Sequence, residues 1–106
     1  MLENKFKTKL IKEIEELLPG CMVLHLDPTE IQGIPDLLVL YKKKWAALEG
    51  KKSINSKQQP NQPYYVDKMN KMSFSRFVCP ENKQEVLDEL QQSLSTRRTT
   101  RIPKCK

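Results

Sequence analysis

The sequence predicts a small α/β domain in which a mixed central sheet is flanked by helices. Apolar residues recur at helical spacing near both ends of the chain, and four short runs have the composition of strands. A further helical pattern separates the third of these runs from the fourth, which gives the order α-β-β-β-α-β-α. The 106 residues suffice for one domain with a single modest core.

Each element is predicted from apolar spacing and from the positions of proline and glycine. Phe6, Leu10, Ile14 and Leu17 form one stripe of an amphipathic helix, which Pro19-Gly20 ends. Three lysines join the runs DLLVLY and WAALE, a pattern typical of a β-hairpin. In chain order, the expected elements are a helix over residues 3–18, strands over 21–26, 36–41 and 45–49, a helix over 62–72, a strand over 74–79 and a helix that follows Pro80. We expect residues 1–94 to form the domain and residues 95–106 to form a basic tail.

Charge and cysteine usage narrow the class of protein. The net charge is +6, and the acid-free tail STRRTTRIPKCK carries +5 of it, which favours a polyanionic partner, with nucleic acid first. The alternative is a solvated tail that aids solubility.

The cysteines and the N-terminal region indicate the cellular compartment. Three widely spaced cysteines without a CxxC pair predict free thiols in a reducing compartment, and the charged N-terminal region does not resemble a signal peptide. We therefore expect an intracellular, cytoplasmic protein without a membrane segment.

Acidic and basic residues lie at the ends of the two most apolar runs. If the hairpin turn is Lys42-Lys43, Tyr41 pairs with Lys44 and Asp36 lies opposite Glu49, whereas a three-residue turn shifts this register by one. Glu49 and Lys51 then share one face of the strand. Two opposed carboxylates can bind a hard cation such as Mg²⁺, with the Gly50 carbonyl as a further ligand. Lys51 can position or deprotonate an attacking water, or balance charge that develops on a phosphate.

The same stretch, GIPDLLVLY…WAALEGKK, resembles the PD-(D/E)xK nuclease core through Pro35-Asp36 and Glu49-Gly50-Lys51. Gly33 and Leu37 extend the first motif to GxPDL, and Ser53 and Gln62 match the serine and glutamine that follow in VRR-NUC and Holliday-junction resolvase-like members. The resemblance covers roughly residues 3–79. It implies a minimal restriction-endonuclease-like core and a bacteriophage endonuclease in a bacterial host cell. It further implies that a homodimer cuts branched DNA such as a four-way junction, with Mg²⁺ as cofactor and Mn²⁺ as its substitute.

The family also expects a glutamate on the first helix and a glutamine at the start of the next one. The apolar stripe of the first helix centres almost on Glu3, which favours Glu3 over the remaining acids Glu13, Glu15 and Glu16. The alternative for Glu3 is a first-turn acid that meets the helix dipole. Gln62 is favoured over Gln58 and Gln59 because it opens the helix.

These expectations define the candidate residues and the competing functions. The candidate catalytic residues are Glu3, Asp36, Glu49, Lys51 and Gln62, the candidate metal ligands are Asp36, Glu49 and Gly50, and the candidate nucleic-acid contacts are Lys51, Lys52, Lys57, Arg97, Arg98 and Arg101. Two other functions compete: a non-catalytic nucleic-acid-binding protein with the nuclease fold, and a nuclease that acts on linear DNA without junction preference.

Overall fold

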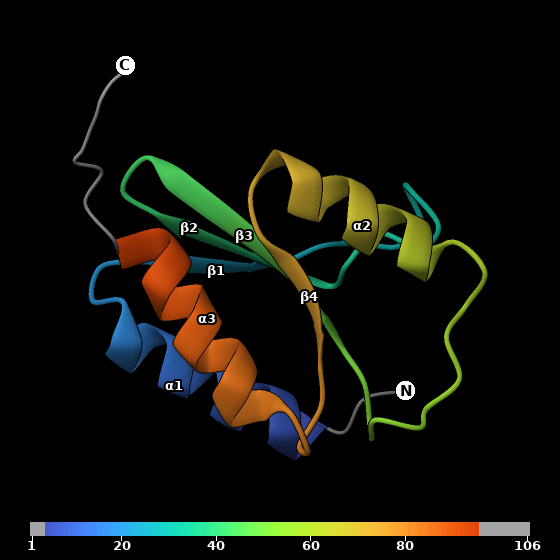
Figure 1. The fold of residues 1–106 in the computed structure, drawn as a ribbon, viewed down its shortest axis with the longest axis horizontal. Coiled ribbons are helices and arrows are strands. Elements are labelled where there is room, and N and C mark those ends of the chain that lie inside the picture. Colours follow the sequence, from blue (N-terminus) through green and yellow to red (C-terminus); the bar gives the residue numbers. More distant parts are fainter. Residues whose placement is uncertain (1–3, 96–106) are drawn as a thin grey trace.

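The computed structural model describes residues 4–95 of the chain. Glu3, Arg97, Arg98 and Arg101 therefore lie outside the described residues. The elements are α1 (Asn4–Leu17), β1 (Met22–His25), β2 (Leu37–Tyr41), β3 (Lys44–Gly50), α2 (Gln62–Met72), β4 (Ser75–Val78) and α3 (Lys83–Ser95). Their order, shown in Figure 1, confirms the order predicted from the sequence.

The four strands form one open mixed sheet in the order β1-β2-β3-β4. Neighbours β1 and β2 are antiparallel, as are β2 and β3, whereas β3 and β4 are parallel. A parallel pair needs a crossover connection, and α2 lies in the segment that joins β3 to β4. The predicted α/β class and mixed sheet are thus confirmed.

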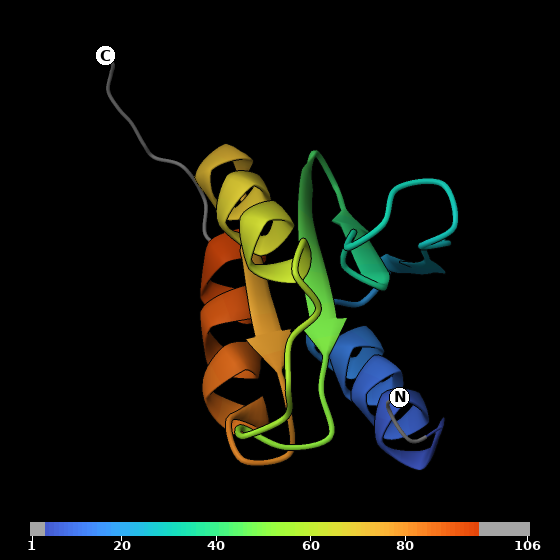
Figure 2. The ribbon, with the colours of Figure 1, turned by 90° about the vertical axis from the view of Figure 1, so that its right-hand side faces the viewer.

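Helices cover both faces of the sheet. Helices α1 and α3 lie against one face and α2 lies against the other, over β3 and β4 (Figures 1 and 2). The core lies between the sheet and the α1–α3 layer, where alternate strand residues meet the apolar stripes of both helices. Its fully buried members include Leu10, Ile14, Leu37, Val39, Leu48 and Leu90. This packing fixes α1 against the end of the sheet at which Asp36 leads into β2.

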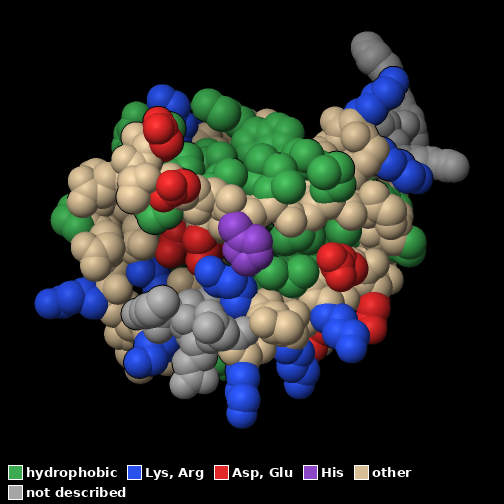
Figure 3. Space-filling model, turned by 180° about the vertical axis from the view of Figure 1, so that it is seen from behind, with side chains coloured by type: hydrophobic (Ala, Val, Ile, Leu, Met, Phe, Trp, Pro, Cys, Tyr) green, Lys and Arg blue, Asp and Glu red, His purple; other side chains and the backbone are tan. Residues whose placement is uncertain are grey.

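Helix α2 leaves the β1–β2 half of its face of the sheet uncovered. Met22 and Leu24 of β1 are exposed there and pair with the half-buried Leu40 and Leu38 of β2. Figure 3 shows a broad hydrophobic area on the side of the molecule that faces away in Figure 1. Within residues 4–95, no helix is long and apolar enough to span a bilayer.

The loop between β1 and β2 packs against the start of α2 through Gly33. This glycine has a φ of +93°, and a Cβ atom placed on it would lie 2.4 Å from the Cβ atom of Asn61. Asn61 Nδ2 also donates a hydrogen bond to the Gln32 carbonyl, at 3.4 Å. Asn61 immediately precedes Gln62, so this contact ties the position of Gln62 to that of the loop that leads into Asp36.

We expect Gly33→Ala to lower the free energy of unfolding by about 2–5 kcal/mol. About 1–2 kcal/mol of this comes from the left-handed backbone and about 1–3 kcal/mol from crowding against Asn61. Gly20→Ala is the matched control because Gly20 has a φ of +91° with nothing within 4 Å of its Cβ position. Gly20→Ala should lower the free energy of unfolding by only the contribution of the left-handed backbone, about 1–2 kcal/mol. Urea unfolding of both variants measures the difference, and equal losses would contradict the packing role of Gly33.

Candidate active site

The register of the β2–β3 hairpin places two carboxylates together. Tyr41 pairs with Lys44 across a two-residue turn, and the ladder continues to the pair Leu37–Leu48. The next residues along the two strands are Asp36 and Glu49, so they lie opposite each other, as the sequence predicted. Asp36 Oδ1 accepts a hydrogen bond from the Gly50 backbone N–H at 3.2 Å, which closes this end of the hairpin.

Glu49 is the most deeply buried charged side chain of this site, with 7% of its surface exposed. Burial raises the pKa of its carboxyl to about 7, and repulsion from Asp36 adds to the rise, while Lys51, Lys7 and a hydrogen bond from the Asp36 backbone act in the opposite direction. Near neutral pH this side chain therefore exchanges between its charged and neutral forms. A cation beside the two carboxylates would favour the charged form.

Gln62 joins Glu49 to Lys51. Its Nε2 donates to Glu49 Oε2 at 3.0 Å, and its Oε1 accepts from Lys51 Nζ and, at 2.9 Å, from the Gln59 backbone N–H. These donors and acceptors define the orientation of the amide. Of the three glutamines considered from the sequence, Gln62 is thus the one whose side chain bonds to both Glu49 and Lys51.

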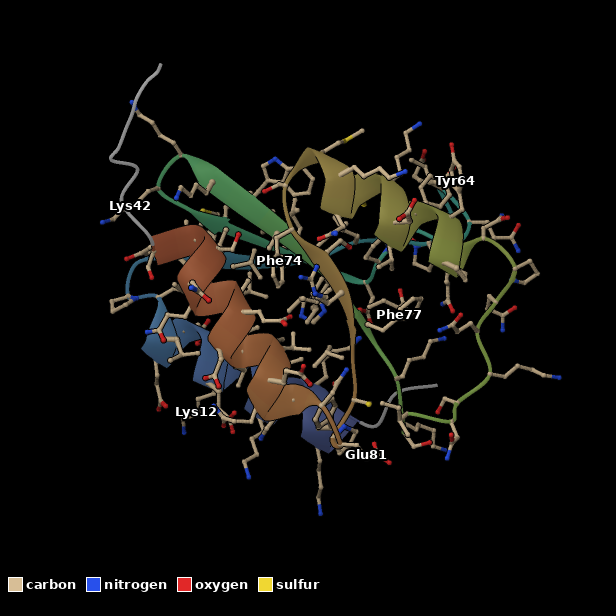
Figure 4. All side chains as sticks on the ribbon, viewed as in Figure 1. Lys12, Lys42, Tyr64, Phe74, Phe77 and Glu81 are labelled. Atoms are coloured by element: carbon tan, nitrogen blue, oxygen red, sulfur yellow. The ribbon has the colours of Figure 1, made fainter. Side chains whose placement is uncertain are left out.

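Lys51 lies in the half-buried part of the site. Besides its bond to Gln62, its ammonium donates to the Lys57 carbonyl at 3.3 Å. It also lies 5.9 Å from the centre of the Phe77 ring, which β4 places beside Glu49. Figure 4 shows Phe77 on β4, between that strand and the loop that leads to α2. These contacts hold the Lys51 head group near Glu49, to which Gln62 also bonds.

Helix α1 supplies a basic residue that the sequence reasoning missed. Lys7 Nζ forms an ion pair with Asp36 Oδ2 at 3.2 Å, and both side chains are mostly buried. The stripe argument that favoured Glu3 from the sequence would equally have favoured Lys7, because residues four apart in a helical sequence share a face. Glu13, an alternative to Glu3, instead pairs with Lys83 of α3 at 3.0 Å.

The site opens into a hollow of about 720 Å³. Residues from α1, β1, β3, α2 and the loops between these elements line it, including His25, Lys52, Lys57 and Gln59. Figure 3 shows acidic and basic side chains meeting beside the single histidine, below the hydrophobic area. Ser53 does not line the hollow; its backbone N–H instead donates to Ser56 Oγ at 3.0 Å within the loop.

The oxygen atoms of the site fit a Mg²⁺ ion. Asp36 and Glu49 supply two carboxylates, and Mg²⁺ is commonly held by one or two carboxylates while it keeps several waters. The Gly50 N–H points toward Asp36, and because the N–H and C=O of a strand residue face the same neighbouring strand, its carbonyl faces that side too. Within residues 4–95, no cluster of three or more His, Cys, Asp or Glu side chains is arranged to hold a metal ion.

The structure thus brings together Asp36, Glu49, Gly50, Lys51 and Gln62, with Lys52 and Lys57 at the rim of the same hollow. Comparison of the chain with protein-family models, with curated proteins and with solved structures found no match. What the site does must therefore be inferred from the chemistry of its own residues.

We expect Glu49→Gln to raise the free energy of unfolding at pH 8 and to leave it nearly unchanged at pH 4. The pKa of Glu49 is raised from 4.5 to about 7, so between these values the folded state binds more protons than the unfolded state. The free energy of unfolding of the wild type therefore falls as pH rises from about 4.5 to about 7, and that of the glutamine variant does not, because glutamine does not ionise. Urea unfolding in EDTA measures it, with Glu30→Gln on the exposed loop as the control that should respond equally at both pH values. A gain that is the same at pH 4 and pH 8 would contradict the buried-charge account.

Proposed function

We propose that the protein is a Mg²⁺-dependent DNA endonuclease that hydrolyses phosphodiester bonds in branched DNA such as a four-way junction. The observation that carries the proposal is the convergence in one hollow of Asp36, which immediately precedes β2, Glu49 and Lys51 at the end of β3, and Gln62 at the start of α2. The resemblance of these residues to the PD-(D/E)xK motif supports the reaction class. The net charge of +6 supports a polyanionic substrate.

The roles of the carboxylates follow from their position. Held by the Asp36 and Glu49 carboxylates and the Gly50 carbonyl, Mg²⁺ would supply charge neutralisation at the phosphate and an activated water. Asp36 is oriented for this by the Gly50 N–H and Glu49 by the Gln62 amide. These hydrogen bonds from defined elements fix the orientation of both carboxylates.

Lys51 orients the attacking water or a phosphate oxygen. An ammonium has three N–H donors, and within the described residues two of them meet Gln62 Oε1 and the Lys57 carbonyl. The third donor remains for the substrate, and the positive charge offsets the negative charge that develops on the phosphate. Gln62 fixes the position of Lys51 relative to Glu49, so it acts as a positioning residue.

The rim of the hollow suits the DNA backbone. Lys52 and Lys57 are exposed there, and lysine contacts to phosphates position a protein on DNA without reading its sequence. Arg97, Arg98 and Arg101 extend this contact in the proposal, although they lie outside the described residues. The paired symmetric cuts that a junction requires would come from two copies of the chain, each with one site.

The test compares wild type with Asp36→Asn on a four-way junction, a linear duplex and a single strand, each with Mg²⁺ or with EDTA. Wild type should cut the junction only with Mg²⁺, and Asp36→Asn should lower the rate by about 10²-fold or more because charge stabilisation worth several kcal/mol is lost. Asp67→Asn is the matched control: Asp67 lies on the exposed side of α2 in an ion pair with Lys71, so its loss should leave the rate unchanged.

Each alternative function has its own outcome in this test. If none of the three substrates is cut in a metal-dependent reaction, the proposal of an enzyme is contradicted. If the junction still binds, the remaining function is that of a non-catalytic DNA-binding protein. Equal cutting of the three substrates would contradict junction preference alone and leave a nuclease without structural selectivity.

A further inference from the structure

Lys7 occupies one of the oxygens that the proposed metal ion needs. Asp36 Oδ2 is 3.2 Å from Lys7 Nζ, and Asp36 Oδ1 accepts the Gly50 N–H, so both oxygens of this carboxylate already have partners. The backbone position of Lys7 is fixed by the fold, because Leu10 and Ile14 anchor α1 in the core. A divalent cation at Asp36 would therefore meet a lysine ammonium at the same carboxylate.

Two cations close to one carboxylate oxygen repel each other, and the repulsion is strong where water is largely excluded. The side chains of Lys7 and Asp36 are only 24% and 22% exposed. Binding of the divalent cation at Asp36 thus requires Lys7 to move away from it. A lysine side chain has the length and the rotatable bonds to do so.

Among the residues that line the hollow, the one acid besides Asp36 is Glu49, which the proposed cation also needs, but the hollow would attract an anion that Lys7 can contact. Four lysines, Lys7, Lys51, Lys52 and Lys57, line it against two carboxyl groups, those of Asp36 and Glu49, so basic residues outnumber acidic ones by two. An excess of positive charge favours a phosphate and disfavours a free divalent cation. A phosphate in the hollow would give Lys7 a new partner when it leaves Asp36.

We propose that Lys7 is an exchangeable counter-ion, which neutralises Asp36 in the absence of a divalent cation and transfers to a DNA phosphate when the cation binds. The inference rests on the proposed function. Its consequence is that the cation and DNA bind cooperatively. By linkage, DNA raises the affinity for the cation by the same factor by which the cation raises the affinity for DNA.

The test measures binding, not cutting. Affinity for Mn²⁺ is measured by electron paramagnetic resonance on the wild-type protein, Lys7→Met, Lys7→Arg and Lys12→Met. Lys12 provides the matched charge loss because it is exposed on the same helix and points away from the sheet (Figure 4). We expect Lys7→Met to bind Mn²⁺ about fivefold or more tightly than wild type. Lys7→Arg, which keeps the charge, and Lys12→Met should stay near the wild-type affinity.

A second measurement tests whether Lys7 contacts a DNA phosphate after the cation displaces it from Asp36. Fluorescence anisotropy gives the affinity for a labelled four-way junction with and without Ca²⁺, an oxygen-seeking cation used here as the binding probe. Ca²⁺ should tighten junction binding by wild type, and the tightening should shrink about fivefold or more in Lys7→Met, because this variant has no ammonium to transfer.

The outcomes separate this inference from the proposed function. Equal Mn²⁺ affinities of wild type and Lys7→Met, or weaker binding by Lys7→Met, would overturn the exchange and leave the nuclease proposal intact. Unchanged coupling between Ca²⁺ and the junction in Lys7→Met would overturn the transfer to phosphate. Absence of Mn²⁺ binding in every variant, Lys7→Met included, would overturn both proposals.

Discussion

The site depends on the pairing of β2 with β3. Because side chains alternate between the two faces of a strand, a shift of one residue in this pairing would move Asp36 away from Glu49 and turn one set of charges to the opposite face. The two-residue turn after Tyr41 sets the register, and Leu37, Val39 and Leu48 maintain it by burial against α1 and α3. The apolar residues of the hairpin thus hold two carboxylates together that would otherwise repel each other.

The other parts of the site are brought to this hairpin by close packing. Gly33 lets the loop before Asp36 approach Asn61, and that contact positions Gln62 at the start of α2. Gln62 in turn bonds to Glu49 on β3 and to Lys51, which immediately follows that strand. Helix α1 adds Lys7 from the opposite layer of the fold. The resulting site is a partly buried cluster of opposite charges, in which burial raises the pKa of Glu49 to about 7.

Local pattern predicted the fold and the hairpin half of the site from the sequence. Apolar spacing and Pro19-Gly20 indicate the helices. The three lysines between two apolar runs indicate the hairpin and hence the pairing of Asp36 with Glu49. The contact of Lys7 with Asp36 could not be predicted in this way. It depends on how α1 packs on the sheet and on the reach of a long side chain, neither of which is a property of local sequence. The raised pKa of Glu49 likewise arises from tertiary burial.

The central claim is that Asp36 and Glu49 form the protein half of a divalent-cation site. Anomalous diffraction from crystals soaked in Mn²⁺ tests it most directly, because the method locates the ion without reference to activity. The account predicts one strong peak between the two carboxylates, at a coordination distance of about 2.0–2.2 Å from an oxygen of each, with Lys7 turned away from Asp36. Crystals that contain Mn²⁺ at other positions, with Lys7 still paired to Asp36 and no peak between the carboxylates, would contradict it.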